Sequence, residues 1–196
     1  MFTPTLLLKG NCLTMQRSTA RLLDEYLVAS ARSGSREAME KLARRWHPRL
    51  AAHALRLTGD RDLAMDAAQA AWGAIMKGIA RLEEPRAFPA WAYRITTRAC
   101  AGEIGQAVAR RKLAQAWASE PRETSVEPEQ PSQLGKLQAA IRQLPAGERA
   151  AIALHHFEDL RVAEVAVALG VPVGTVKTRL MNARCKLRAI LEGEVS

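Results

Sequence analysis

Residues 162–188, VAEVAVALGVPVGTVKTRLMNARCKLR, constrain the fold of this chain more than any other segment. Val162, Val165 and Leu169 fall at i, i+3 and i+7, which is the spacing of a buried helical stripe. Gly170 then ends that helix, because glycine tolerates the left-handed conformation of a C-terminal cap. The segment therefore predicts a short helix and a tight turn, followed by a second helix.

The second helix of this pair is expected to turn a run of positive charge toward solvent. Pro172 stands at its entrance, where a proline costs least. Its apolar face consists of Val176, Leu180, Ala183 and Leu187. Residues 173–188 hold five basic side chains and no acidic one, namely Lys177, Arg179, Arg184, Lys186 and Arg188. A helix-turn-helix with a cationic outer face suits the major groove of DNA, although a purely structural hairpin would show the same apolar stripe and glycine.

The composition favours a soluble, mainly helical protein with a polyanionic partner. The 196 residues suit one large or two small domains, and the net charge is +9. No apolar run approaches the ~20 residues that cross a bilayer, so no membrane insertion is expected. Cys12, Cys100 and Cys185 stand singly and form no metal-binding or disulfide pattern, which fits the cytoplasm.

Helical periodicity divides the chain into two domains, and no strand alternation is visible. Residues 1–19 show little periodicity and are predicted to be a disordered tail, or to precede a true start at Met15. Residues 20–112 form a first helical domain and residues 135–196 a second. Between them, residues 113–134 are rich in proline and glutamate, which is typical of a flexible acidic linker. The predicted fold class is all-α.

Cap residues mark the helices of the first domain. Ser35 is expected to cap the start of one helix, and Asp60 the start of the next. Gly59 between two helices is a natural C-terminal cap. The predicted helices cover residues 20–32, 36–57, 61–79 and 87–112.

Four segments, in this order, resemble bacterial RNA polymerase sigma factors of the sigma-70 family, extracytoplasmic function (ECF) type. They are HPRLAAHALRLTGDRDLAMDAAQAAW (47–72), AFPAWAYRITTRA (87–99), LPAGERAAIALHHFEDL (144–160) and the helix-turn-helix. The resemblance implies a sigma-2 helical bundle followed by a sigma-4 domain. It further implies core RNA polymerase, promoter DNA and an anti-sigma factor as partners.

The resemblance assigns core-polymerase binding to Asp66, Gln69 and Trp72. These residues are three apart and are expected to share one helical face. A carboxylate, an amide and a large ring could anchor a partner helix there. Alternatively, Trp72 belongs to the core of its own domain.

The resemblance assigns recognition and melting of the promoter −10 element to residues 81–112. Melted bases need surfaces that replace their stacking, and a flipped base needs a pocket, for which residues 82–86 are the candidate. Trp91 and Ile95 are expected in the core instead. The residues assigned to −10 DNA are Arg86, Phe88, Arg94, Arg98, Arg110, Arg111 and Lys112.

Recognition of the −35 element falls, by the same resemblance, to the second helix of the helix-turn-helix. The residues assigned are Thr175, Lys177, Thr178, Arg179, Arg184 and Lys186. Arg179 can bind guanine through two hydrogen bonds, whereas Lys177 and Thr175 suit phosphates. Arg184 and Lys186, a turn or more later, suit the DNA backbone.

No catalytic, metal or cofactor site is predicted. His155 and His156 are adjacent, so on a helix they point about 100° apart, and no cysteine or carboxylate cluster completes a ligand set. Neither a nucleophile–base arrangement nor a glycine-rich phosphate loop occurs. The chain is therefore expected not to be an enzyme.

The linker length predicts how the two domains work together. Its 22 residues reach ~75 Å when fully extended, but average only ~25 Å as a flexible coil. Two DNA sites about two helical turns apart are ~70 Å from each other. The free protein should therefore seldom engage both promoter elements, and the polymerase must hold the domains apart.

Three other functions stay open at this point. One is a stand-alone helix-turn-helix regulator whose first domain binds another protein. The second is a nucleic-acid-modifying enzyme, which the absence of an acid–base or metal set disfavours. The third is a helical adaptor with a basic surface, whose DNA binding would depend on salt and ignore sequence.

Overall fold

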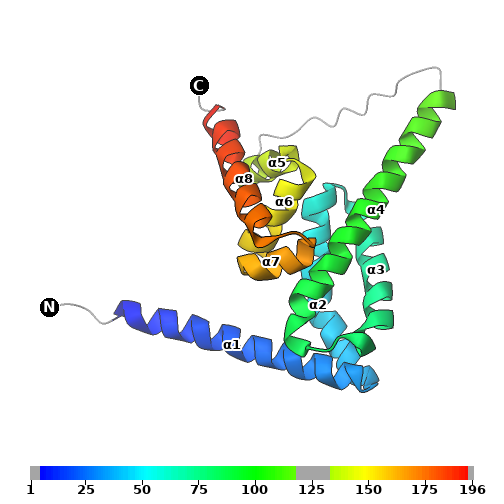
Figure 1. The fold of residues 1–196 in the computed structure, drawn as a ribbon. Coiled ribbons are helices and arrows are strands. Elements are labelled where there is room, and N and C mark those ends of the chain that lie inside the picture. Colours follow the sequence, from blue (N-terminus) through cyan, green and yellow to red (C-terminus); the bar gives the residue numbers. More distant parts are fainter. Residues whose placement is uncertain (1–4, 118–132, 194–196) are drawn as a thin grey trace.

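The computed structural model describes residues 5–117 and 133–193, and within these ranges every regular element is a helix or a helical turn (Figure 1). The first half contains α1 (Thr5–Arg32), α2 (Arg36–Thr58), α3 (Arg61–Gly78), the 3-10 turns η1 (Ile79–Arg81) and η2 (Pro85–Ala87), and α4 (Phe88–Trp117). The second half contains α5 (Gln133–Gln143), α6 (Ala146–Ile152), the π-helical turn η3 (Ala153–Phe157), α7 (Val162–Leu169) and α8 (Val173–Gly193). The predicted all-α fold class is confirmed.

The caps between α1 and α3 lie where the sequence predicts them. Ser35 Oγ accepts a hydrogen bond from the Ala38 amide at 3.2 Å, which satisfies one free donor of the first turn of α2. Gly59 ends α2 with φ of 70°, the left-handed conformation expected of a C-terminal cap. Asp60 then accepts from the amides of residues 62 and 63 to begin α3.

Two helices are longer than predicted. α1 begins at Thr5, so residues 5–19 are helical where a tail was expected. α4 continues past Lys112 to Trp117, because its last residues, Leu-Ala-Gln-Ala-Trp, contain good helix formers. Residues 118–132, the centre of the predicted linker, lie outside the described residues.

Aromatic rings at the centre of the first half join α2 to α4. Trp46 of α2 meets Phe88 edge to face, with ring centroids 5.2 Å apart, and Tyr93 at 5.8 Å. Leu42 and Leu50, one turn to either side of Trp46, are fully buried against the same core. These contacts set the position of α4, which carries most of the candidate −10 residues.

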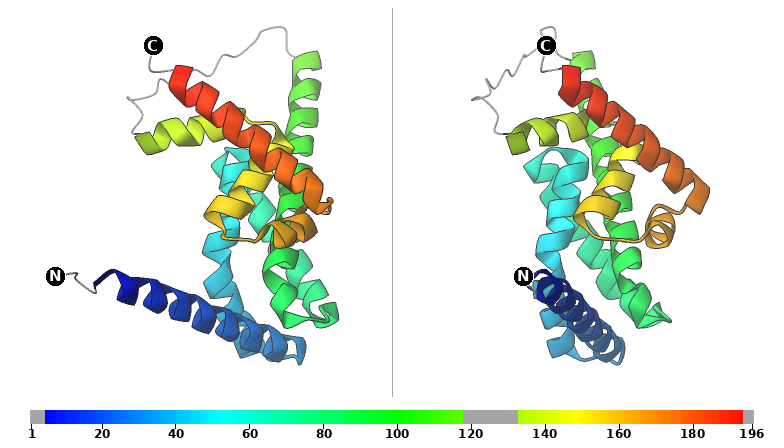
Figure 2. Two further views of the ribbon diagram at one scale, coloured as in Figure 1. Left: turned by 60° about the vertical axis from the view of Figure 1, so that its left-hand side comes forward. Right: turned by 90° about the vertical axis from the view of Figure 1, so that its left-hand side faces the viewer.

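The second half packs against the first rather than standing apart from it (Figures 1 and 2). α7 lies across α4, while α5 and η3 contact α2. Buried side chains of both halves form a single contiguous apolar cluster, which runs from Leu27 in α1 to Ala183 in α8. α1 extends beyond this body as an arm (Figure 2).

No helix in residues 5–117 or 133–193 combines the length and apolar character that spanning a membrane requires.

Candidate nucleic-acid and polymerase interfaces

The helix-turn-helix forms as the sequence predicts. Val165, Ala166 and Ala168 bury one side of α7 against Val176 and Leu180 of α8 and the surrounding core. Gly170 caps α7 with φ of 65°. At the entrance of α8, the Pro172 carbonyl accepts the first helical hydrogen bond, from the Val176 amide at 3.2 Å.

The six candidate −35 residues all belong to α8, but they differ in exposure. Lys177 and Thr178 are exposed near its N-terminal end. Thr175 and Arg179 are half-buried, and the Arg179 guanidinium lies close to Gly147 of α6. The N-terminal turns of α8 therefore present Lys177 and Thr178 most directly to solvent.

Contacts within the second half hold the two later candidates of α8. Lys186 forms an ion pair with Glu148 of α6, with Nζ and Oε1 2.7 Å apart. Arg184 Nη2 lies 3.3 Å from His156 Nε2. Burial, His155 and Arg184 all lower the pKa of His156, so that nitrogen can accept a hydrogen bond near neutral pH. Both cations remain exposed enough to contact a DNA backbone.

The candidate −10 residues are distributed around α4. Phe88 is fully buried against Trp46, which corrects its assignment to DNA contact: the ring supports α4 from inside. Trp91 and Ile95 pack partly buried against the same core, as expected. Arg98, Arg110, Arg111 and Lys112 are exposed along the outer part of the helix.

Arg94 is only half-exposed, because α7 covers it. A Cβ placed on Gly170 would lie 3.9 Å from Arg94 Nη2, so the turn of the helix-turn-helix sits beside this guanidinium. Arg94 Nε is buried and has no hydrogen-bond partner among the described residues. A buried donor without an acceptor is unusual in a folded protein.

Arg86 borders a cleft of about 270 Å³ between the two halves. Arg86 Nε lies 3.3 Å from Glu84 Oε1, and the same carboxylate accepts from the Arg86 amide at the start of η2. The cleft includes part of the loop proposed for a flipped base. Its lining residues come from α1, η2, α4, and α7 with the residue that caps it: Arg21, Asp24, Glu25, Pro85, Arg86, Pro89, Arg161 and Glu164.

The predicted polymerase-docking residues do not share one face of α3. Asp66 and Gln69 are exposed, whereas Trp72 is only 9% exposed and packs in the core. The reason is geometric: at 3.6 residues per turn, each step of three residues rotates the side chain by about 60°, so Trp72 points about 120° from Asp66. The exposed stripe of α3 includes Met65 and Met76 instead, which are 53% and 59% exposed.

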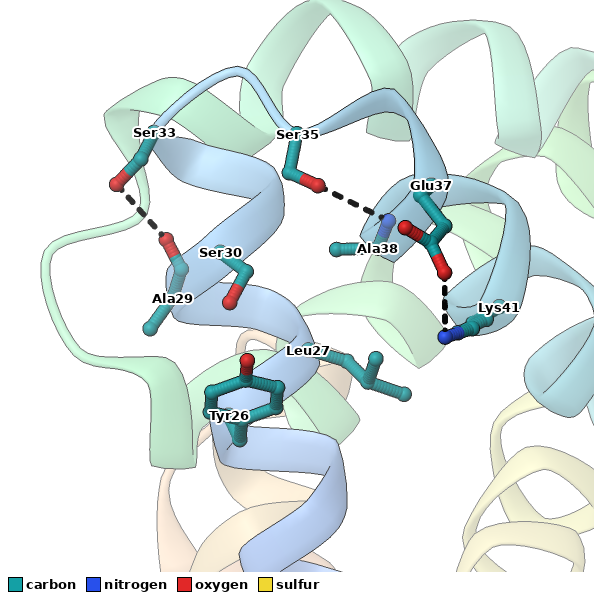
Figure 3. A pocket seen from close by; sticks show the side chains of 9 residues that line it. All are labelled: Tyr26, Leu27, Ala29, Ser30, Ser33, Ser35, Glu37, Ala38 and Lys41. Carbon is teal, nitrogen blue, oxygen red and sulfur yellow. Dashed lines mark hydrogen bonds and ion pairs between the residues drawn. The ribbon is translucent and has the colours of Figure 1, made fainter.

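A second cavity, of about 480 Å³, opens at the turn between α1 and α2 (Figure 3). Its polar side chains serve the helix ends around it. Ser33 Oγ donates to the Ala29 carbonyl, Ser35 caps α2, and Lys41 Nζ lies 2.7 Å from a Glu37 oxygen. These bonds stabilise the ends of α1 and α2.

The histidines form no metal site. No group of three or more potential metal ligands occurs within residues 5–117 and 133–193. His155 Nδ1 donates to the Leu160 carbonyl at 2.9 Å, so this ring closes the turn before α7. His53 is fully buried in α2, and burial, with Arg56 nearby, lowers its pKa to about 3. It is therefore a neutral core residue that lies 3.0 Å from the Thr97 hydroxyl.

Sequence reasoning missed one polar cluster, which joins the two halves of the molecule. Glu158 stands in the turn after η3, and its side chain is only 6% exposed. Its Oε1 lies 2.6 Å from Nη1 of Arg56 in α2, and its Oε2 accepts a hydrogen bond from the hydroxyl of Tyr93 in α4. Burial raises the pKa of Glu158, and Tyr93 and Arg56 oppose that shift. No sequence pattern links these three positions, because they meet only in the folded chain.

Comparison with known proteins matches both halves of the chain to one class of transcription factor. Residues 42–113 match the family model "Sigma-70 region 2", and residues 134–187 match "Sigma-70, region 4". The ECF RNA polymerase sigma factor SigM of Mycobacterium tuberculosis is 31% identical over 173 residues, which cover 86% of this chain and 84% of that protein. The RNA polymerase sigma-H factor of Pseudomonas aeruginosa is 27% identical over 176 residues, covering 82% and 90%.

Solved structures share the same architecture. CnrH, in complex with the cytosolic domain of CnrY, superposes with a TM-score of 0.66 at 25% identity, over 87% of this chain and 98% of that one. The sigma factor RpoE of Bartonella quintana, in complex with the anti-sigma factor NepR, gives 0.64 at 22% identity, over 78% and 96%.

The two domains thus define a sigma-70-type initiation factor. Within that class, the chain belongs to the ECF sigma factors. It directs core RNA polymerase to promoters.

Proposed function

We propose that α8 recognises the −35 element through its N-terminal turns. Lys177 and Thr178 are exposed there, and Arg179 stands on the flank beside α6. The first turns of a recognition helix are the part that meets base edges in the major groove. Arg184 and Lys186, further along the helix, suit the phosphates on either side. Their contacts with His156 and Glu148 orient them without burying their charge.

The −10 element, in this proposal, is bound along α4. Arg98, Arg110, Arg111 and Lys112 are exposed cations of this helix, and Arg94 precedes Arg98 by one turn. Phosphate contacts of this kind position DNA, whereas sequence is recognised at base edges or at unstacked bases. The cleft beside Arg86 is the candidate position for such a base.

Core polymerase, in this proposal, docks on the exposed stripe of α3. Asp66 and Gln69 supply the polar contacts that set the register. Met65 and Met76 supply apolar area, and methionine adapts readily to a partner surface. Trp72 supports this helix from the core side.

The partners and setting follow from the same class. CnrH and RpoE were each solved with a bound protein, the cytosolic domain of CnrY and the anti-sigma factor NepR. We infer that an anti-sigma factor binds this chain as well, and that the chain acts in the cytoplasm, without catalysis or a cofactor of its own. We also infer that residues 20–112 and 135–196 act as domains joined by the linker at 113–134.

The observation that carries this assignment is the presence of an exposed set of basic side chains in each of the two matched regions. The test is transcription in vitro with purified core polymerase and genomic DNA of the source organism, followed by mapping of transcript starts. We expect shared sequence boxes near −10 and −35. Lys177→Ala should lower output from these promoters severalfold, while Lys41→Ala, which removes an exposed cation of α2, should not.

Docking on α3 has its own measurement. The double variant Asp66→Ala/Gln69→Ala should bind core polymerase at least tenfold more weakly than the parent in a titration with labelled chain. The control is Glu40→Ala, which removes an exposed carboxylate of α2. Equal affinities for the two variants would contradict the docking surface, and an absence of promoter-specific transcripts would contradict the assignment as a whole.

A further inference from the structure

The contact between the two halves centres on one buried carboxylate. Glu158 follows η3 in the second half, and both of its oxygens are engaged by the first half: Arg56 of α2 on one side, Tyr93 of α4 on the other. The Arg56 guanidinium also stacks on the Phe157 ring, 4.6 Å from its centre. Three elements that are far apart in sequence therefore meet at a single charged group.

The backbone around Glu158 departs from regular geometry to bring it there. Residues 153–157 form a π-helical turn, and π-helical turns occur frequently at functional sites. Asp159 follows with φ of 55°, a left-handed conformation that is uncommon for a residue other than glycine. The Leu160 amide then bonds to the Leu154 carbonyl at 3.1 Å, which closes the loop. Such local strain persists where the surrounding structure demands it.

This contact places the second half over part of the proposed −10 surface. α7 packs along α4, and the turn at Gly170 lies beside Arg94. Arg94 Nε is left buried without an acceptor among the described residues, an imbalance that a DNA phosphate would correct once α7 moves away. The closed arrangement therefore satisfies Glu158 and leaves Nε of Arg94 without an acceptor among the described residues.

A polar contact of this kind suits a reversible closure better than a permanent one. A buried ion pair adds little net stability, because removing two charges from water offsets most of their attraction. It does fix one geometry, and both charges can return to water when the halves separate. One part of the contact consists of small residues, because Ala150, Ala153 and Cys100 lie in one cluster with Ala54 and Ala64. A larger apolar cluster also spans both halves.

We propose that the Arg56–Glu158–Tyr93 contact is a latch that holds the free chain closed, with the helix-turn-helix over α4, and that it must open before α4 can bind DNA. The closure itself is supported by the contacts of Glu158 with Arg56 and Tyr93 and by the packing of α7 on α4. Its regulatory meaning rests on the proposed assignment of α4 to the −10 element.

The first test measures closure without polymerase or DNA. Small-angle X-ray scattering of the full chain should give a radius of gyration near the ~16 Å of a compact chain of this length, somewhat enlarged by α1. Glu158→Gln should increase it by several ångströms. The matched control is Glu192→Gln, which removes the same charge from α8, where Glu192 pairs with Arg188 one turn away.

A second readout uses Cys100, which is 1% exposed in the cluster that both halves build. In a Cys12→Ser/Cys185→Ser background it is the sole thiol. With Ellman's reagent, Glu158→Gln should raise its reaction rate at least tenfold over Glu192→Gln. Arg56→Gln, which acts from the other half, should do the same. Circular dichroism measures whether each variant remains folded. If Glu158→Gln is unfolded, the comparison is made with Arg56→Gln instead.

The scattering result decides the closure. An unchanged radius of gyration in both Glu158→Gln and Arg56→Gln overturns the latch. This holds even if Cys100 reacts faster, because a faster reaction alone would report only local fraying. A larger radius supports the latch even where α2 and α3 keep Cys100 covered.

The regulatory role has a separate readout. Binding of the free chain to a fluorescein-labelled 40-base-pair duplex of random sequence should tighten severalfold in Glu158→Gln relative to Glu192→Gln, because opening uncovers Arg94 and its neighbours. Equal affinities overturn the regulatory role while leaving the closure intact. Failure of the promoter-mapping experiment, with the larger radius still observed, would instead count against the proposed function alone.

Discussion

The helix-turn-helix and α4 both carry candidate DNA contacts, but they are built in different ways. In α7 and α8, one apolar stripe faces the core, and Lys177, Thr178, Arg184 and Lys186 face solvent. α4 instead packs against α2, α3 and α7, so candidates along one helix range from fully buried Phe88 to exposed Arg98. The exposed side of α7 and α8 can be predicted from the spacing of their apolar residues. The exposed side of α4 cannot, because this helix is packed on several sides.

The largest effect should come from the aromatic core under α4. Phe88→Ala should cost about 3–5 kcal/mol of unfolding free energy, because it leaves a cavity against Trp46 in a fully packed core. Val108→Ala on the exposed side of the same helix should change it by less than about 0.5 kcal/mol. Urea denaturation followed by circular dichroism measures both. A small loss for Phe88→Ala would return this ring to the candidate DNA contacts.

The recognition helix can be probed one base at a time. Arg179→Ala should weaken binding of the chain–polymerase complex by roughly 1–3 kcal/mol at one −35 base position, and the preference there should relax. Lys177→Ala should weaken binding to all sequences alike, as expected of a phosphate contact. Competition between single-base variants of a mapped promoter gives both values. Equal weakening by Arg179→Ala on every sequence would make it another phosphate contact, consistent with its position beside Gly147.

The buried histidine of α2 should make the first half sensitive to acid. The pKa of His53 is lowered from 6.5 to about 3 by burial, so the folded state holds it neutral while the unfolded state protonates below pH 6.5. The contribution of neutral His53 to the free energy of unfolding is therefore complete above pH 6.5 and is lost as the pH falls toward 3. Between pH 7.5 and 5.5 this loss is about 1.4 kcal/mol.

Urea denaturation at the two pH values, compared between variants, isolates this residue. His53→Gln should remove about 1.4 kcal/mol of the pH dependence, although it lowers stability at both pH values. His47→Gln, an exposed position on the same helix, should leave the dependence as in the parent. An unchanged pH dependence in His53→Gln would show that other groups cause the acid sensitivity.

Features set by short-range chemistry could be predicted from the sequence. The caps at Ser35, Gly59 and Gly170 depend on residues within a few positions, and they form as expected. Trp72 lies in the core, which is the alternative that the sequence left open, because residues three apart drift around a helix. The site at Glu158 could not be predicted, because its partners are 102 and 65 residues away. A glutamate beside an aspartate in a turn gives no local signal that it will be buried.

The smallest predicted effects compare two glycines, one in each DNA-facing element. Gly170 has φ of 65°, so Gly170→Ala should cost about 1 kcal/mol of unfolding free energy through backbone strain, since a Cβ there would meet only Arg94 Nη2, at 3.9 Å. Gly105 lies inside α4, and a Cβ there would meet nothing within 4 Å. Gly105→Ala should therefore add about 0.5–1 kcal/mol, because alanine loses less freedom in a helix. Urea midpoints of the two variants should shift in opposite directions. An unchanged or higher midpoint for Gly170→Ala would mean that the turn of the helix-turn-helix tolerates other conformations.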